Sequence, residues 1–203
     1  MNKLRGPVKW TDYYLYVFLD VFSRYVVGWM LVPHEGAQLA KRLIGETCRE
    51  FEVSEGQLTI HAERGSSMTS KPVVLLLTDL GVTKMHSRPH VSDSNPYSGS
   101  QFRTMKHRPE FPDRFGSIQG ARAFCRRFSP WYNDEHRHSG IGLLTPVTLH
   151  FGLAEEARQQ RQAVLAAAYQ QQPERAARRH PTPIAMPKEV WINKSPTIDS
   201  NTQ

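Results

Sequence analysis

The sequence of 203 residues is poor in cysteine and has no long hydrophobic run. Cys48 and Cys125 are its only cysteines, and no apolar stretch approaches the roughly 20 residues that cross a bilayer. The positive charges near the N-terminus are not followed by an apolar signal core. These absences argue against a disulfide framework, a cysteine metal cage, membrane insertion and secretion. We therefore expect a cytoplasmic protein without a membrane partner.

Several common catalytic motifs are also missing from the sequence. It contains no Gly-x-x-x-x-Gly-Lys-Ser/Thr phosphate loop, no Gly-x-Ser-x-Gly elbow and no His-Glu-x-x-His zinc helix. The run from Glu135 to His138 contains two histidines, but side chains two positions apart on a helix point away from each other. Hydrogen bonding or phosphate contact is therefore favoured over metal binding for these histidines.

The charge is positive and unevenly distributed. The chain has 26 Lys and Arg against 19 Asp and Glu, for a net charge of +7. Residues 84 to 138 hold much of the excess, together with five of the nine histidines and several aromatic residues. This mixture suits a surface that faces polyphosphate, although a basic, solvated helix face has the same composition.

Periodicity indicates an α/β fold. Residues 13–20 and 25–32 are rich in aromatic and β-branched residues and predict a β-hairpin with both faces covered. Residues 37–51 carry an amphipathic helical pattern. Short strands are expected at residues 58–62 and 82–86, with a helix between them that Ser70 caps. The order of these elements predicts a mixed sheet flanked by helices.

The second half of the chain reads as mostly helical. Helices are expected near residues 98–107, from Ser117 with a kink at Pro130, and over residues 154–169. The proline-rich end should be an irregular arm with Trp191 as its buried anchor. We expect a core domain over residues 1–152, followed by a C-terminal helix and arm over residues 153–203.

Several motifs occur together in a specific order. They are Leu-Asp-Val-Phe-Ser-Arg-Tyr-Val-Val-Gly-Trp from Leu19, His-Ala-Glu-Arg-Gly-Ser from His61, Asn-Pro-Tyr-Ser from Asn95, and Trp-Tyr-Asn from Trp131 with the following His136, His138, Thr145 and Pro146. In this combination the chain resembles the integrase core of bacterial insertion-sequence transposases over nearly its whole length. The resemblance implies a ribonuclease-H-like fold, and the first strand of that fold is largely missing here.

The resemblance also implies a catalytic site that this chain does not reproduce. The family uses three carboxylates to hold two Mg²⁺ ions, which activate a hydroxyl and stabilise the leaving oxygen of a phosphodiester. The chain begins after the first acidic position, has Glu63 in place of the second Asp and has Gly99 in place of the third acid, a Glu. Glu63 is thus the remaining catalytic and metal-binding candidate. We expect Asp20 and Asp93 to have structural roles rather than to replace the missing acidic ligands. Arg24 is the expected structural partner of Asp20.

Three functions remain open at this point. The favoured one is a catalytically inactive remnant that retains DNA binding through a set of cations implied by charge and by the resemblance. The set comprises Lys84, Arg88, Arg103, Lys106, Arg108 and Arg126. The alternatives are an interaction protein that joins and inhibits full-length transposase, and an active Mg²⁺-dependent polynucleotidyl transferase. Strand edges that lack a pairing partner in the sheet should favour self-association or association with full-length transposase.

Overall fold

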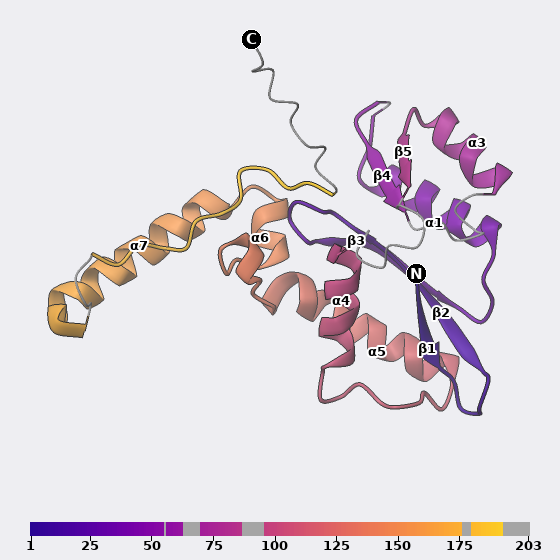
Figure 1. Cartoon of the computed structure of the whole chain (residues 1–203), viewed down its shortest axis with the longest axis horizontal. Helices are drawn as coiled ribbons and strands as arrows, with labels where there is room; N and C mark the ends of the chain where they lie inside the picture. The colour runs from indigo at the N-terminus through magenta and orange to yellow at the C-terminus, as the bar shows by residue number, and fades with distance from the viewer. Residues whose placement is uncertain (55, 63–69, 87–95, 176–179, 193–203) are drawn as a thin grey trace, which may run out of the picture.

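A computed structural model describes residues 1–54, 56–62, 70–86, 96–175 and 180–192 of the chain (Figure 1). Three candidate site residues, Glu63, Arg88 and Asp93, lie outside these ranges, as does Asn95 of the Asn-Pro-Tyr-Ser motif. In the described ranges no helix is both long and apolar enough to cross a membrane.

The first layer of the fold is an antiparallel sheet in the order β1-β2-β3. The predicted hairpin is confirmed as β2 (Asp12–Leu19) and β3 (Val26–Val32). The structure adds a short strand that the sequence did not indicate, β1 (Asn2–Arg5), which pairs with the first half of β2 from Asp12 to Leu15.

A second layer contains the parallel pair β4 (Thr59–Ala62) and β5 (Thr83–His86). The helices α1 (Ala37–Glu50) and α3 (Lys71–Asp79) pack with these strands, as the sequence predicted. The expected mixed sheet is thus present as two separate sheets, because no described strand joins β1 or β2 to β4. Ser70 is the N-cap of α3 by position, but its hydroxyl makes no capping hydrogen bond, so that expectation was wrong.

The remaining helices follow in the second half of the chain. They are α4 (Pro96–Lys106), α5 (Ile118–Pro130), α6 (Pro146–His150) and α7 (Ala154–Gln171), with short turns η3 (Ser139–Ile141) and η4 (Pro173–Arg175). Helices α4 and α5 lie on the other side of the antiparallel sheet (Figure 1). Ser117 caps α5 by accepting a hydrogen bond from the Gly120 N–H at 3.0 Å. At Pro130 the α-helix does not stop but widens into the π-helical turn η2 (Trp131–Glu135).

Both faces of the antiparallel sheet are covered, as the hairpin pattern predicted. Figure 1 shows α4 and α5 on one side of this sheet, where Leu15 and Leu31 join a cluster with Phe124. On the other side, Tyr16 and Val32 pack with α1, α3 and the parallel pair. The fold is therefore three-layered, with the hairpin as the shared middle layer.

Each cysteine lies in one of these two apolar clusters, in accord with the expectation of inert core thiols. Cys125 packs with α5 against the sheet, and burial raises the pKa of its thiol to about 12. Cys48 lies on the buried face of α1, where burial also raises the thiol pKa. Neither thiol is ionised near neutral pH, so neither has the thiolate character of a nucleophile.

Helix α7 projects away from the layered body in Figure 1, and the arm formed by residues 180–192 returns alongside it. Gln162 donates a hydrogen bond to the Pro181 carbonyl, and the rings of Tyr169 and His180 are 4.9 Å apart. The domain boundary near residue 152 remains a prediction, although the start of α7 at Ala154 lies close to it.

The contact between β3 and α1 generates a testable prediction about stability. A Cβ atom at Gly28 would lie 2.5 Å from Thr47 Oγ1, so the helix approaches the strand as closely as a glycine permits. We expect Gly28→Ala to lower the free energy of unfolding by about 1–3 kcal/mol through overpacking. The double variant Gly28→Ala/Thr47→Ala should recover most of this loss in urea denaturation.

Gly45 provides the matched control on the same helix. A Cβ atom there meets nothing within 4 Å, so Gly45→Ala should raise the free energy of unfolding by about 0.5–1 kcal/mol through helix propensity. Equal stabilities for wild type and Gly28→Ala would contradict the close packing of β3 on α1.

Candidate nucleic-acid interface

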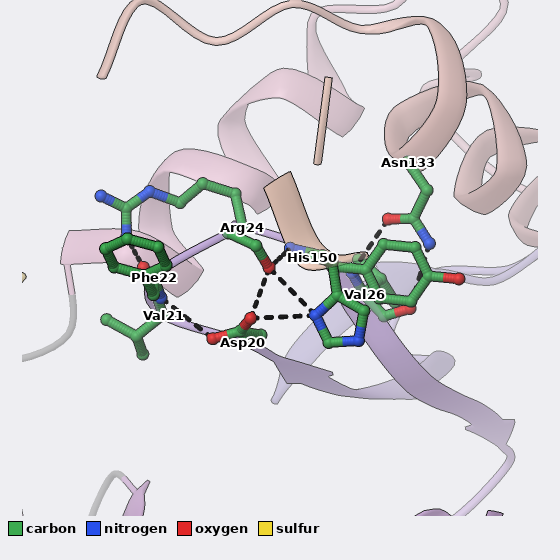
Figure 2. A network of polar contacts seen from close by, with 9 residues as sticks. Asp20, Val21, Phe22, Arg24, Val26, Asn133 and His150 are labelled. Atoms are coloured by element: carbon green, nitrogen blue, oxygen red, sulfur yellow. Dashed lines mark hydrogen bonds and ion pairs between the residues drawn. The ribbon is translucent and has the colours of Figure 1, made fainter. Parts of the chain in front are cut away.

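The turn between β2 and β3 is organised by the carboxylate of Asp20 (Figure 2). Its Oδ1 accepts a hydrogen bond from the Phe22 N–H at 3.0 Å, and its Oδ2 accepts one from the Ser23 hydroxyl. The backbone N–H of Arg24 also donates to the Asp20 carbonyl at 2.8 Å. These bonds hold Arg24 at a φ of +68°, a left-handed conformation that non-glycine residues adopt only under local constraint.

The same carboxylate ties the turn to α6. His150 Nδ1 lies 3.0 Å from Asp20 Oδ2, and the imidazole stacks on Tyr25 with ring centroids 4.4 Å apart. Burial alone would raise the pKa of Asp20, but hydrogen bonds from Ser23, His150 and the Phe22 N–H outweigh it and hold that pKa below its ordinary value. Asp20 is therefore an ionised structural residue whose oxygens are already engaged, which supports its structural interpretation over metal binding.

Arg24 connects this turn to the start of α4. Its guanidinium lies over the Tyr97 ring at 3.8 Å from the centroid and donates to the Val21 carbonyl. Figure 2 shows the guanidinium directed at Val21, away from the Asp20 carboxylate. Arg24 is a structural partner of Asp20, as expected, through its backbone N–H, which donates to the Asp20 carbonyl at 2.8 Å, while Ser23 and His150 engage the carboxylate. The cation–π contact of its guanidinium fixes α4 against the turn.

The arm reaches the same end of α4. The Tyr97 hydroxyl donates a hydrogen bond of 3.1 Å to the Trp191 carbonyl. The Trp191 residue itself is 56% exposed, so the expectation of a buried anchor was wrong. The arm is held here through its backbone, and burial of the indole is not required for that contact.

Helix α4 presents one exposed face that includes the third acidic position of the resemblance. Gly99, Arg103 and Lys106 are exposed and stand at i, i+4 and i+7, a spacing that places them on one side of a helix. The opposite face carries Met105, which is fully buried against the sheet. Lys106 Nζ donates to Asn2 Oδ1 of β1 at 3.3 Å, which places this basic face beside the β1 edge of the sheet.

The other predicted DNA-binding cations do not all join this face. Arg126 lines a groove of about 510 Å³ with Trp29 of β3 and Glu46 of α1, at the opposite edge of the antiparallel sheet from β1. Arg108 stacks over Trp131 at 3.9 Å and pairs with Glu110 at 3.0 Å. Lys84 lies in β5. The structure therefore brings together Arg103 and Lys106, and separates Arg126 from them.

Asn133 of the Trp-Tyr-Asn motif and Arg122 of α5 have structural roles in this region that the sequence did not reveal. Asn133 pairs with the backbone of β3 in both directions, because its Oδ1 accepts from the Val26 N–H at 2.9 Å and its Nδ2 donates to the Val26 carbonyl at 3.1 Å. Arg122 donates twice to the Leu31 carbonyl, at 3.2 and 3.1 Å. The two side chains satisfy backbone groups of an edge strand that would otherwise be available for strand pairing.

The two histidines that follow this motif are in contact but do not form a metal centre. The rings of His136 and His138 lie 4.4 Å apart, and burial is the main cause that lowers the pKa of His138 to about 4. His138 Nε2 is buried and has no hydrogen-bond partner among the described residues. The backbone N–H of His138 does bond to the Leu144 carbonyl, at 3.0 Å.

The described part of the chain does not bring together a donor set for a two-metal Mg²⁺ clamp. Gly99 offers no side-chain oxygen, and the oxygens of Asp20 are engaged by Ser23, His150 and the Phe22 N–H. Within the described part of the chain, no three His, Cys, Asp or Glu side chains gather as a metal site would require. Glu63 lies outside that part. Magnesium prefers near-octahedral oxygen coordination, which a single carboxylate cannot supply for two ions.

The three-layered arrangement of this chain is that of ribonuclease-H-like integrase catalytic cores. It is similar to the catalytic core domain of BIV integrase, with a TM-score of 0.51 and 19% identity over 77% of this chain and 95% of that chain. It is also similar to a chain of the simian T-cell lymphotropic virus intasome, solved in complex with PP2A regulatory subunit B56 gamma, with a TM-score of 0.53 and 15% identity over 73% of this chain and 52% of that chain.

Sequence comparison identifies the family. Two models, both described as integrase core domain, match residues 3–92 and residues 80–146. The transposase for insertion sequence element IS904 of Lactococcus lactis subsp. lactis (strain IL1403) is 26% identical over 141 residues, which are 69% of this chain and 55% of that protein. The chain thus spans about half the length of this curated relative. It belongs to the integrase core family and is similar to an insertion-sequence transposase.

Removal of the Asp20 carboxylate should show how much the turn contributes to stability. We expect Asp20→Ala to lower the free energy of unfolding at pH 7 by about 1–3 kcal/mol, since it leaves buried partners unsatisfied. Because the folded-state pKa of Asp20 is lowered, the carboxylate stabilises the fold above its unfolded pKa of about 3.9. This stabilisation is lost as the pH falls through the folded pKa.

The difference between wild type and Asp20→Ala should therefore shrink in urea denaturation as the pH is lowered through this range. Asp113→Ala is the matched control, because Asp113 is an exposed carboxylate paired with Arg5 at 2.8 Å. Its removal should cost at most about 1 kcal/mol. An equal effect of the two substitutions at pH 7 would contradict the central role of Asp20.

Proposed function

We propose that this chain is a transposase-type integrase core that binds DNA and has lost its own cleavage activity. The observation that carries this proposal is the exposed face of α4. It retains Arg103 and Lys106 but has Gly99 at the position where the family resemblance places a carboxylate. Such a face attracts phosphate without supplying a ligand for the metal ions that cleavage requires.

The absence of a carboxylate at position 99 changes the electrostatics of this face as well as its ability to bind metal. A glutamate at position 99 would stand one helical turn from Arg103 and partly neutralise it. With Gly99 the face is uniformly cationic, so attraction to a phosphate backbone is stronger in the absence of a divalent ion. Loss of a metal ligand and gain of non-specific DNA affinity thus follow from the same residue.

An interaction with another polypeptide is the second candidate, and a feature of the sheet favours it. The strand β1 pairs only with Asp12–Leu15 of β2, so among the described strands the second half of β2 is paired on the β3 side alone. An open strand edge of this kind can accept an extended segment from another chain. An intact transposase is the partner that this alternative implies, and its activity would then be inhibited.

Substitution of the two α4 cations tests DNA binding. We expect Arg103→Ala/Lys106→Ala to weaken binding of a labelled duplex. The slope of log affinity against log salt should become shallower by about 0.9 for each phosphate that the variant no longer neutralises. The measurement is fluorescence anisotropy over a salt series.

The matched control is Arg49→Ala, which removes an exposed cation from α1 in the other helical layer and should leave the slope unchanged. Equal slopes for the double variant and wild type would contradict a DNA-binding role for α4. Retention of an intact transposase on a column by a chain that binds no DNA would select the interaction function instead.

A plasmid assay tests the loss of cleavage. We expect supercoiled plasmid to stay intact in the presence of wild-type protein and Mg²⁺, because Gly99 supplies no ligand. Wild type and Glu63→Ala should give the same result. Nicking by wild type that disappears both with a chelator and in Glu63→Ala would establish the active transferase and refute the proposal.

A further inference from the structure

The tip of the β1–β2 hairpin presents an unusually exposed tryptophan. Trp10 is 89% exposed, and it adjoins Val8, which is 59% exposed. Pro7 and Lys9 are exposed beside them, so the tip forms a small continuous apolar surface with one cation. Isolated surface hydrophobic residues are common, but a large aromatic ring with almost no protein contact is not explained by packing.

The backbone of this tip is fixed in a strained conformation. Trp10 has a φ of +71°, which is an outlier for a bulky residue. Gly6 N–H donates to the Thr11 carbonyl at 2.7 Å, and the Thr11 hydroxyl donates to the Val8 carbonyl at 2.7 Å. Strain of this kind persists where surrounding bonds enforce it, and it directs the indole outward into solvent.

A side chain from a distant part of the sequence braces the tip further. One Arg114 guanidinium nitrogen donates to the carbonyls of Gly6 and Val8 at 3.1 and 3.2 Å. A Cβ atom at Gly6 would lie 2.6 Å from Thr11 Oγ1, so the turn is also closely packed at its base. The ring is therefore presented by a rigid support, and a ligand that contacts it pays little ordering entropy.

The charges around the tip favour an anionic partner. Lys9 Nζ lies 5.3 Å from the centroid of the Trp10 ring, and Arg114 adds a second positive charge at the turn. The nearby carboxylates of Asp12 and Asp113 are each engaged by a cation, Lys3 at 4.0 Å and Arg5 at 2.8 Å. The tip region thus has four cations and two carboxylates, and both carboxylates are paired. A net positive charge therefore remains around the exposed indole ring.

From this geometry we propose that the hairpin tip is a second nucleic-acid contact, in which Trp10 stacks on an unpaired base while Lys9 and Arg114 attract the adjacent phosphates. An exposed aromatic ring with neighbouring cations is the combination that binds single-stranded nucleic acid, because every base has a face on which a ring can stack. This inference rests on the proposed DNA-binding function and adds a preference for DNA with unpaired bases.

The test compares two labelled DNAs of equal length, one fully paired and one with a short single-stranded flap. Wild type should bind the flapped DNA more tightly. Trp10→Ala and Trp10→Gly should each weaken binding to the flap about tenfold, which corresponds to about 1.4 kcal/mol, with a smaller effect on the paired duplex. Trp10→Phe retains a ring, so its affinity for the flapped DNA should lie between that of wild type and that of Trp10→Ala. Val164→Ala removes another exposed apolar side chain, on α7, and should change neither affinity.

Stability supplies an independent readout. Since glycine adopts a positive φ without strain, Trp10→Gly should unfold at a temperature at least as high as wild type while it binds the flap more weakly. A purely structural role for Trp10 would instead lower the unfolding temperature.

The possible failures are distinguishable. If wild type binds neither DNA, both the proposed function and this inference are refuted. If wild type binds DNA and the Trp10 variants bind each DNA with the same affinity as wild type, only the hairpin inference is refuted. A concentration-dependent dimer of wild type that Trp10→Ala dissociates, with DNA binding unchanged, would show that the tip contacts protein and not nucleic acid.

Discussion

The ionised carboxylate of Asp20 is the interaction on which the described site depends. It lies where the two long strands of the middle layer turn, and it accepts hydrogen bonds from Phe22, Ser23 and His150. These bonds connect three segments that are far apart in the sequence: the hairpin, α6 and, through Arg24 and Tyr97, the start of α4. Without them the hairpin would still pair, but the turn would lose its direct tie to α6 and the local support for the Arg24 conformation that contacts α4.

The residues that stabilise the position of α4 differ from the position at which the resemblance places a metal ligand. The groups that hold α4 in place are Arg24, Tyr97 and the buried Met105, and none of these is the position at which the family carries its third acid. Gly99 is exposed, and a side chain there would meet nothing. A change at position 99 therefore acts on metal binding and surface charge, with little effect on packing beyond the intrinsic preference of the helix.

Local patterns predicted most of the elements, because alternation and helical periodicity depend on neighbours in sequence. The hairpin, α1 and the apolar stripe of α5 follow directly from such patterns. The strand β1 could not be found in this way, since four residues with one buried side chain, Leu4, have no recognisable period. Its identity as a strand depends on the pairing edge that β2 offers.

At the site, the predictions failed mainly where the partner of a side chain is distant in the sequence. Arg24 is close to Asp20 in sequence and has the opposite charge, yet the carboxylate is taken by a histidine 130 positions away. Arg126 has the same charge as Arg103, but helical projection alone cannot tell which sheet edge a residue faces. Trp191 has the composition of a buried anchor, while the structure leaves the residue 56% exposed and engages its carbonyl. In each case residue type was informative and the partner was set by the tertiary fold.

The combination of Gly99 with a retained basic face has a physical consequence for how such a domain persists. A catalytic carboxylate near other acids is costly while no metal is bound, because like charges repel and each must be desolvated when substrate approaches. A glycine at position 99 avoids any such cost, but it forgoes the attraction that a carboxylate would have to Arg103 and lowers helix propensity by roughly 1 kcal/mol. The fold can therefore tolerate the absence of the ligand, and the cations of α4 are left with no opposing charge at position 99. Under the proposed function, a polyanion is then the ligand that suits this face, whether or not the bond-breaking chemistry survives.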